Sequence, residues 1–270
     1  MKLMYITNRP EVAKIAQAAG VDWIFVDLET VGKQARQGGL DTVQSRHTVA
    51  DVAAMRPYVK AGGLLVRVNP IYEGSQAEID AVIAAGADII MLPYFKSKEE
   101  VAAFLGFVGG RCRTILLFET PEAADLAADI AAMDGVELCF IGLNDLHLGY
   151  GMKFMFQLLA DGTVEKLCKV FRAAGKPYGF GGIARIGGGA LPAEAVLGEH
   201  VRLGSQAVIV SRSFCNADKE TLEATQEIFR REVPKLSDCV AAWQSAGEEA
   251  LEENRRRVVR GVAAVLETLS

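Results

Sequence analysis

Short apolar runs alternate with helix-like stretches along most of this 270-residue chain. Runs such as Trp23-Ile24-Phe25-Val26 are nearly continuous in apolar side chains, which is typical of parallel strands buried on both faces. The predicted strands span residues 2–8, 22–29, 63–70, 87–94, 113–120, 136–146, 177–183 and 207–213. Helix-like patterns between them cover residues 11–19, 76–85, 98–108, 121–133 and 192–203. Eight strands that alternate strictly with helices predict an α/β protein of the (β/α)8 TIM-barrel class.

A doubly wound open sheet is the main structural alternative. Its nucleotide-binding fingerprint, a glycine loop after the first strand, is missing here, because that strand ends in Thr7-Asn8-Arg9-Pro10. We therefore expect one catalytic barrel domain over residues 1–233. Residues 234–270 carry an apolar face on an otherwise charged helix. We expect them to form a C-terminal helical extension that packs on the barrel or on a neighbouring subunit.

Composition restricts the class of partner and the compartment. The chain has 34 Asp and Glu against 29 Lys and Arg, so it has no general attraction for a nucleic-acid backbone. The apolar stretch at the N-terminus is too short for a signal-peptide core or a membrane span. The five cysteines form no CxxC pair and suggest neither zinc nor a disulfide framework. We expect a cytoplasmic protein without nucleic-acid or membrane partners.

Two acidic residues follow the fifth and sixth predicted strands. Barrels of this class build their active sites at the carboxyl ends of the strands, so Glu119 and Asp145 are expected near each other. Two carboxylates plus water form the hard oxygen site that Mg²⁺ or Mn²⁺ prefers. They could also be ordinary surface acids. If they do converge, a metal or a basic partner is expected, because two adjacent carboxylates without one would raise at least one pKa.

Arg67 ends the third predicted strand and is a candidate for substrate binding. Its guanidinium offers two parallel donors to a carboxylate and keeps its charge at any working pH. The alternative is a salt bridge to Asp27 or Glu29, at the end of the second strand, and the two roles can coexist. The backbone amides from Gly142 to Asp145 are a second candidate anion site.

Three further features have more than one interpretation. The segment from Thr30 to His47 is longer than a usual connector, and we favour an active-site loop over local disorder. His47 in this segment is a candidate general base, His147 could orient a ligand or a carboxylate, and His200 is expected to be structural. The glycine-rich segment 179–189 follows the seventh strand, where barrels often bind phosphate. A mobile lid or a tight strand-to-helix crossing explains its glycines equally well, so a phosphate site is the minority interpretation.

Taken in order, these motifs resemble the HpcH/HpaI aldolase and citrate lyase β-chain family, which are metal-dependent enzymes on a (β/α)8 barrel. The resemblance covers most of residues 3–216. The motifs that carry it are DWIFVDLE at 22–29, VRVNP at 66–70, GADIIMLP at 86–93, Glu119-Thr120 and FIGLNDL at 140–146.

The resemblance implies roles for the residues at the strand ends. Glu119 and Asp145 would hold a divalent metal, and Arg67 would bind a 2-oxo acid such as pyruvate or its enolate. Amides around Gly142 and Asn144 would bind the substrate carboxylate. No cofactor beyond Mg²⁺ or Mn²⁺ is indicated.

One departure from the family pattern concerns the catalytic base. The aldolase branch has a histidine directly after its Asp-x-Glu pair, and this chain has Thr30 there. His47, a metal-bound water, or a carboxylate of the Asp27 and Glu29 pair could supply the base instead.

The leading hypothesis is a metal-dependent carbon–carbon lyase, an aldolase acting through a metal-bound enolate of pyruvate or a related 2-oxo acid. Pro93 and Thr120, at the ends of the fourth and fifth strands, are assigned to the same substrate site. One alternative is a citrate lyase β-like acyl-CoA lyase or thioesterase. Another is a non-catalytic barrel that binds a metal and an oxo-acid. The resemblance also implies a homo-oligomer.

Overall fold

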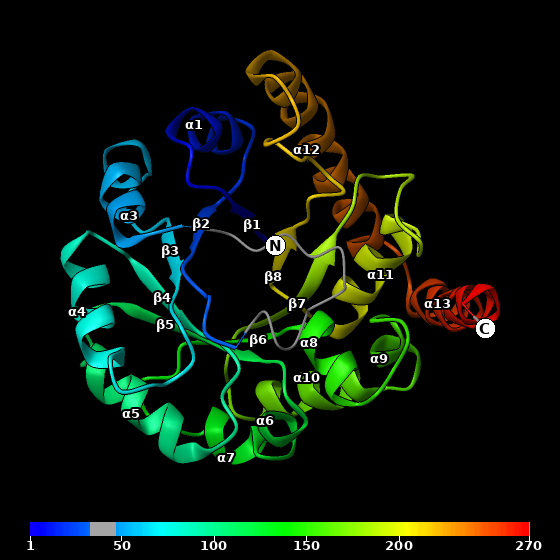
Figure 1. The fold of residues 1–270 in the computed structure, drawn as a ribbon. Helices are drawn as coiled ribbons and strands as arrows, with labels where there is room; N and C mark the ends of the chain where they lie inside the picture. The colour runs from blue at the N-terminus through cyan, green and yellow to red at the C-terminus, as the bar shows by residue number, and fades with distance from the viewer. Residues whose placement is uncertain (33–46, 270) are drawn as a thin grey trace.

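The computed structural model describes residues 1–32 and 47–269, and its centre is a closed barrel of eight parallel strands ringed by helices (Figure 1). The strands are β1 Lys2–Ile6, β2 Trp23–Asp27, β3 Leu64–Arg67, β4 Ile89–Leu92, β5 Arg113–Phe118, β6 Leu138–Ile141, β7 Tyr178–Ile183 and β8 Ala207–Val210. They follow each other in chain order, and β8 pairs with β1 to close the barrel. The predicted (β/α)8 barrel is therefore confirmed, and each strand is shorter than predicted.

The helices lie outside the barrel (Figure 1). They are α1 Pro10–Ala18, α3 Val49–Met55, the 3-10 helix Arg56–Tyr58, α4 Ser75–Ala84, α5 Lys98–Val108, α6 Pro121–Asp125, α7 Ala127–Ala131, α8 Leu143–Gly149, α9 Gln157–Ala160, α10 Thr163–Ala173, α11 Ala193–Leu203, α12 Leu222–Gln244 and α13 Glu248–Thr268. The single helix predicted over 121–133 is wrong in one respect. It is divided into α6 and α7, because Leu126 has φ −92° and ψ 6° and interrupts the helical backbone.

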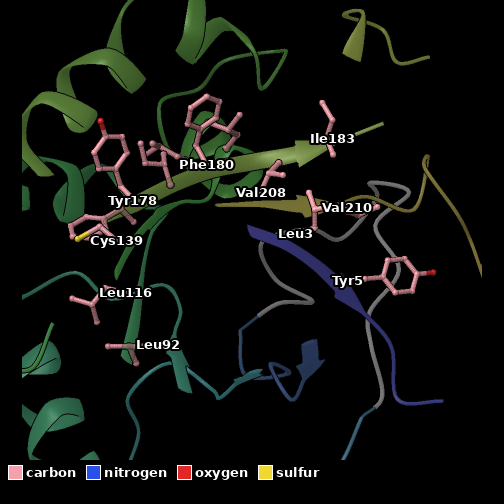
Figure 2. Close-up of a cluster of buried hydrophobic side chains, with 14 of the residues drawn as sticks. Leu3, Tyr5, Leu92, Leu116, Cys139, Tyr178, Phe180, Ile183, Val208 and Val210 are labelled. Atoms are coloured by element: carbon pink, nitrogen blue, oxygen red, sulfur yellow. The ribbon is translucent and has the colours of Figure 1, made fainter. Parts of the chain in front are cut away.

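Residues of each strand alternate between two cores, as the two-residue period of a strand requires. One core fills the barrel and includes Met4, Phe25, Leu65, Leu117 and Phe140. The other lies between the barrel and its helices. Figure 2 shows members of this outer core, with Leu3 and Tyr5 from β1 and Val208 and Val210 from β8.

The C-terminal helices pack on the same chain. α12 contacts α1 and α11, and α13 contacts α11 and α9. Val258 and Val262 of α13 are buried, and the Trp243 indole donates a hydrogen bond to the Glu194 carbonyl at 2.9 Å. The predicted domain boundary at residue 233 falls inside the continuous helix α12, and the division into two domains stays a prediction.

A membrane-spanning helix is not found among the described residues. The two longest helices, α12 and α13, are too polar for a span, and the others are too short.

Candidate active site

A cavity of about 680 Å³ lies at the carboxyl ends of the strands. This is the end at which barrels of this class place their chemistry. Seven of the ten predicted site residues line it: Asp27, His47, Arg67, Glu119, Gly142, Asn144 and Asp145.

Strand alternation explains why four of these residues face the cavity. Asp27, Arg67, Glu119 and Gly142 each stand two positions after a residue that fills the barrel interior. Those interior residues are Phe25, Leu65, Leu117 and Phe140. In each of these four strands, the row of apolar side chains that fills the barrel is therefore followed at the rim by a polar or small residue.

The other three predicted residues, Glu29, Pro93 and Thr120, are not among the described lining residues. Thr120 stands one position out of phase with the inward row, so its hydroxyl points to α6. It accepts a hydrogen bond from the Ala123 amide at 3.1 Å and donates one to the Phe95 carbonyl at 2.8 Å. The structure thus uses Thr120 as the N-cap of α6 and does not bring it to the cavity.

Arg67 is held by two buried acids. Its Nε and Nη2 donate to the two carboxylate oxygens of Asp27 at 2.8 Å each, and Nη2 lies 3.3 Å from Oε2 of Glu29. Burial disfavours the charge on Arg67, but Asp27 and Glu29 outweigh it and raise the pKa of Arg67 well above its usual value. The guanidinium also lies over the Phe25 ring, 5.5 Å from its centroid. The expected ion pair is present, and it fixes a permanent positive charge at the cavity.

His47 reaches the same side of the cavity. Its Nδ1 accepts a hydrogen bond from the Asp27 backbone amide at 3.0 Å. An amide can donate only to a ring nitrogen that carries a lone pair, so the proton of a neutral His47 belongs on Nε2. Asp27 therefore orients both Arg67 and His47, one through its carboxylate and the other through its backbone.

Glu119 is held at the end of β5 by backbone groups. It is 3% exposed, and its Oε1 accepts a hydrogen bond from the Tyr94 amide at 3.0 Å. Tyr94 has φ +48°, the left-handed region that non-glycine residues rarely adopt. On the other side, a Cβ on Gly142 would lie 2.6 Å from Oε2 of Glu119, so only glycine allows β6 to pass this close to the carboxylate.

Asp145 is 7% exposed and lies in the first turn of α8. The amides of the first turn of a helix have no carbonyl partner within the helix, and the residue before α8 is Gly142, which has no side chain to cap them. Leu143 and Asn144, at the start of this turn, both line the cavity. His147 lies further along α8, where its Nδ1 is 3.0 Å from the Leu143 carbonyl.

The donor set suits a hard divalent cation. Glu119 and Asp145 are both nearly buried and line one cavity, and carboxylate oxygens are the ligands that hard divalent cations prefer. Within the described residues, no three or more His, Cys, Asp or Glu side chains form a ready-made metal cluster. Mg²⁺ commonly binds through one or two carboxylates and fills its remaining positions with water and substrate oxygens. The residues present therefore fit Mg²⁺ or Mn²⁺ better than a metal ion whose ligands all come from the protein.

Thr30 occupies the position where the aldolase branch has its histidine. Its amide donates to Oδ1 of Asn69 at 2.8 Å, and its side chain is exposed. The rest of the predicted active-site loop, residues 33–46, lies outside the described residues. His200, expected to be structural, is fully buried in α11 and stacks on Phe180 at 3.7 Å. Burial lowers its pKa to about 3, so it is neutral.

Three contributors to the site were not predicted from the sequence. The Tyr94 amide was missed because a left-handed tyrosine has no sequence signal. Phe154 to Phe156, in the segment between α8 and α9, line the cavity, and the signal that was overlooked is an apolar run where a polar connector is expected. The third is Arg212, just after β8. The glycine-rich segment forms β7 and the loop after it, and Gly181 and Gly182 also line the cavity.

Comparisons with known proteins show related sequences and related folds. A family model described as HpcH/HpaI aldolase/citrate lyase matches residues 2–176. A 4-hydroxy-2-oxovalerate aldolase from Novosphingobium aromaticivorans is 26% identical over 200 residues, which are 63% of this chain and 71% of that protein.

Two solved structures share the fold at lower identity. The citrate lyase β subunit of M. tuberculosis, complexed with oxaloacetate and magnesium, is 20% identical and has a TM-score of 0.60 over 85% of this chain and 96% of that chain. An HpcH/HpaI aldolase/citrate lyase family protein from Burkholderia cenocepacia is 17% identical and has a TM-score of 0.63 over 84% of this chain and 94% of that chain.

The family match runs from β1 to the end of α10 and includes the ends of the six strands β1 to β6. Arg67, Glu119 and Asp145 all lie within it. The chain therefore belongs to the HpcH/HpaI aldolase/citrate lyase family.

Proposed function

We propose that the protein is a divalent-metal-dependent carbon–carbon lyase that cleaves or forms a bond next to a 2-oxo acid such as pyruvate. The observation that carries this proposal is the convergence of Glu119, Asp145 and Arg67 on one cavity. Two comparisons support it. The relative from N. aromaticivorans is named an aldolase of a 4-hydroxy-2-oxo acid, and the M. tuberculosis subunit was determined with oxaloacetate and magnesium.

The binding roles follow from charge and geometry. A cation held by Glu119 and Asp145 would act as a Lewis acid toward the negative charge that develops on the substrate oxygen. Arg67 keeps a positive charge beside that position, and its charge is felt by Glu119. Amides of the first turn of α8 bind the substrate carboxylate, because they lie at the same wall as Asp145.

The reaction is a retro-aldol cleavage in one direction. A base takes the proton from the C4 hydroxyl of a 4-hydroxy-2-oxo acid, and the bond between C3 and C4 breaks. C4 leaves as an aldehyde, and the electron pair of the broken bond stays on the three-carbon fragment as an enolate. That enolate takes up a proton at C3 and becomes pyruvate.

We assign the acid–base roles of this reaction to two residues. Because Nδ1 of His47 accepts the Asp27 amide, the ring presents Nε2–H as a hydrogen-bond donor, which suits the aldehyde oxygen. Glu29 is fully buried and is not among the described lining residues, whereas Asp27, although only 1% exposed, is one of them. Both oxygens of Asp27 already accept hydrogen bonds from Arg67, so we assign removal of the C4 hydroxyl proton to Asp27 acting through one water.

The test uses pyruvate alone, because proton exchange needs no aldehyde. With Mg²⁺ in heavy water, the methyl protons of pyruvate should exchange for deuterium, as measured by proton NMR. A chelator should stop the exchange, and Glu119→Gln should slow it by about a hundredfold or more, because it removes one charged oxygen ligand.

The matched control is Glu122→Gln, which makes the same change at an exposed residue of α6 that pairs with Lys96 at 3.0 Å outside the cavity. It should exchange at the wild-type rate. Exchange that persists at that rate in folded Glu119→Gln, or with the metal removed, would contradict the proposal.

A further inference from the structure

We infer that the aldehyde half of the substrate carries a bulky apolar group, aromatic or branched, which binds to one wall of the cavity. This wall, called the apolar wall, consists of Phe154, Met155, Phe156 and Leu191. The inference rests on the proposed lyase activity, since that activity defines which half of the substrate is the aldehyde. It concerns a part of the cavity that binding of the 2-oxo acid does not use.

The cavity is much larger than a three-carbon acid. Its volume of about 680 Å³ lies within the range of roughly 300–1,000 Å³ that holds drug-sized ligands. Asp27, Arg67, Glu119 and Asp145 come from the rim of β2 to β6, so the oxo-acid is confined to that side. The remaining volume lies toward β7, β8 and the connection between α8 and α9.

Two aromatic rings give the apolar wall a defined shape. Phe154 and Phe156 meet edge to face with their centroids 5.4 Å apart. Phe156 is buried, whereas Phe154 and Met155 are half-buried. Gln157 anchors this turn, because its Oε1 accepts the amides of Lys153 and Phe154 at 2.9 Å each. The rings are thus presented to the cavity by an ordered turn, and Met155 adds an adaptable apolar surface.

The C-terminal extension supports the wall from behind. Leu191 lines the cavity and is 2% exposed. A Cβ on Gly261 would lie 2.9 Å from Cδ1 of Leu191, so α13 passes directly against this side chain. Leu191 therefore contacts α13 with one side and the cavity with another. A helix outside the barrel consequently fixes the width of the apolar wall.

Charged groups elsewhere on the lining do not favour an anionic tail on the aldehyde. Arg212 and Asp218, after β8, both line the cavity and carry opposite charges. This part of the lining therefore does not carry charge of one sign only. The binding of a neutral apolar group is favoured because the group leaves water and packs on the apolar wall, and this gain in free energy does not depend on a nearby charge.

The experiment compares cleavage of two aldol adducts of pyruvate, one made with benzaldehyde and one with acetaldehyde. In the wild type, kcat/KM for the benzaldehyde adduct should exceed that for the acetaldehyde adduct by about tenfold or more. Phe154→Ala should lower this ratio by about tenfold, because it removes a ring that only the larger adduct reaches. The matched control is Phe107→Ala, a half-buried phenylalanine of α5 away from the cavity, which should keep the wild-type ratio.

Failure of the inference and failure of the lyase proposal give different results. Cleavage of both adducts at similar kcat/KM, or the same loss for both in Phe154→Ala, would overturn the inference and leave the lyase activity standing. If neither adduct is cleaved, the lyase proposal fails, and benzyl alcohol becomes the probe. Its binding, followed by saturation-transfer NMR, should be present in the wild type and Phe107→Ala and lost in Phe154→Ala. Absence of benzyl alcohol binding to the wild type would overturn the apolar wall as a binding surface.

Discussion

At the scale of single residues, the orientation of the Glu119 carboxylate depends on the backbone conformation of two other residues. Gly142 leaves room for Oε2, and Tyr94 turns its amide toward Oε1 from a left-handed conformation. Such strained positions persist where the surrounding structure holds them, and they concentrate at functional sites. The strain at Tyr94 is a cost to stability that fixes the orientation of one predicted metal ligand.

Two separate substitutions of Tyr94 measure the energetic cost of that backbone strain. Tyr94→Gly and Tyr94→Ala both remove the ring and keep the amide, but only glycine adopts φ near +48° freely. The free energy of unfolding, measured with urea, should be higher for the glycine variant by about 1 kcal/mol.

The same pair of substitutions at Tyr150 provides the control, because φ there is −86°. At that position alanine should equal or exceed glycine in stability. An alanine variant of Tyr94 as stable as its glycine variant would show that the position is unstrained.

At the scale of elements, sequence periodicity predicted all eight strands because most of them are nearly unbroken apolar runs. It placed the ends of seven of them too late, and only β7 ends at the predicted residue. No change in residue type along the sequence marks where the hydrogen bonds of a strand stop. Thr120 was assigned to the substrate site because it lies near the end of a predicted strand. It stands three positions after the inward-facing Leu117, so the alternation of side chains along a strand directs it away from the cavity. The break at Leu126 has no glycine or proline to announce it.

The packing of α13 on α11 depends on one buried polar side chain. Asn254 is 3% exposed, and its Nδ2 donates to the Ala195 carbonyl at 2.9 Å and to Oε1 of Glu199 at 3.2 Å. Asn254→Ala should lower the free energy of unfolding by about 1–3 kcal/mol, because two buried acceptors lose a donor.

Urea denaturation measures this loss. Arg257→Ala, at an exposed position of the same helix, is the control and should change stability by less than about 0.5 kcal/mol. Equal stabilities for the two variants would mean that the contact of Asn254 with α11 contributes nothing.

At the scale of the whole molecule, the barrel brings together residues that are far apart in the chain, from Asp27 to Arg212. The rim that carries the proposed metal ligands was predictable, because fold class alone places the ends of β2, β3, β5 and β6 at one end of the barrel. The apolar wall was not, because it depends on how the connections after β6 and β7 fold and on α13 behind them. Assembly of several subunits stays a prediction, and the buried face of α13 lies against its own barrel.

The central claim is that Glu119 and Asp145 hold a divalent cation to which a 2-oxo acid binds in turn. Its most direct test is the affinity for Mn²⁺, followed by electron paramagnetic resonance of the free ion, with and without pyruvate. Because coupling between two ligands at one site is reciprocal, pyruvate should tighten Mn²⁺ binding by about tenfold, and Asp145→Asn should abolish this effect. The same Mn²⁺ affinity with and without pyruvate in the wild type would contradict the account.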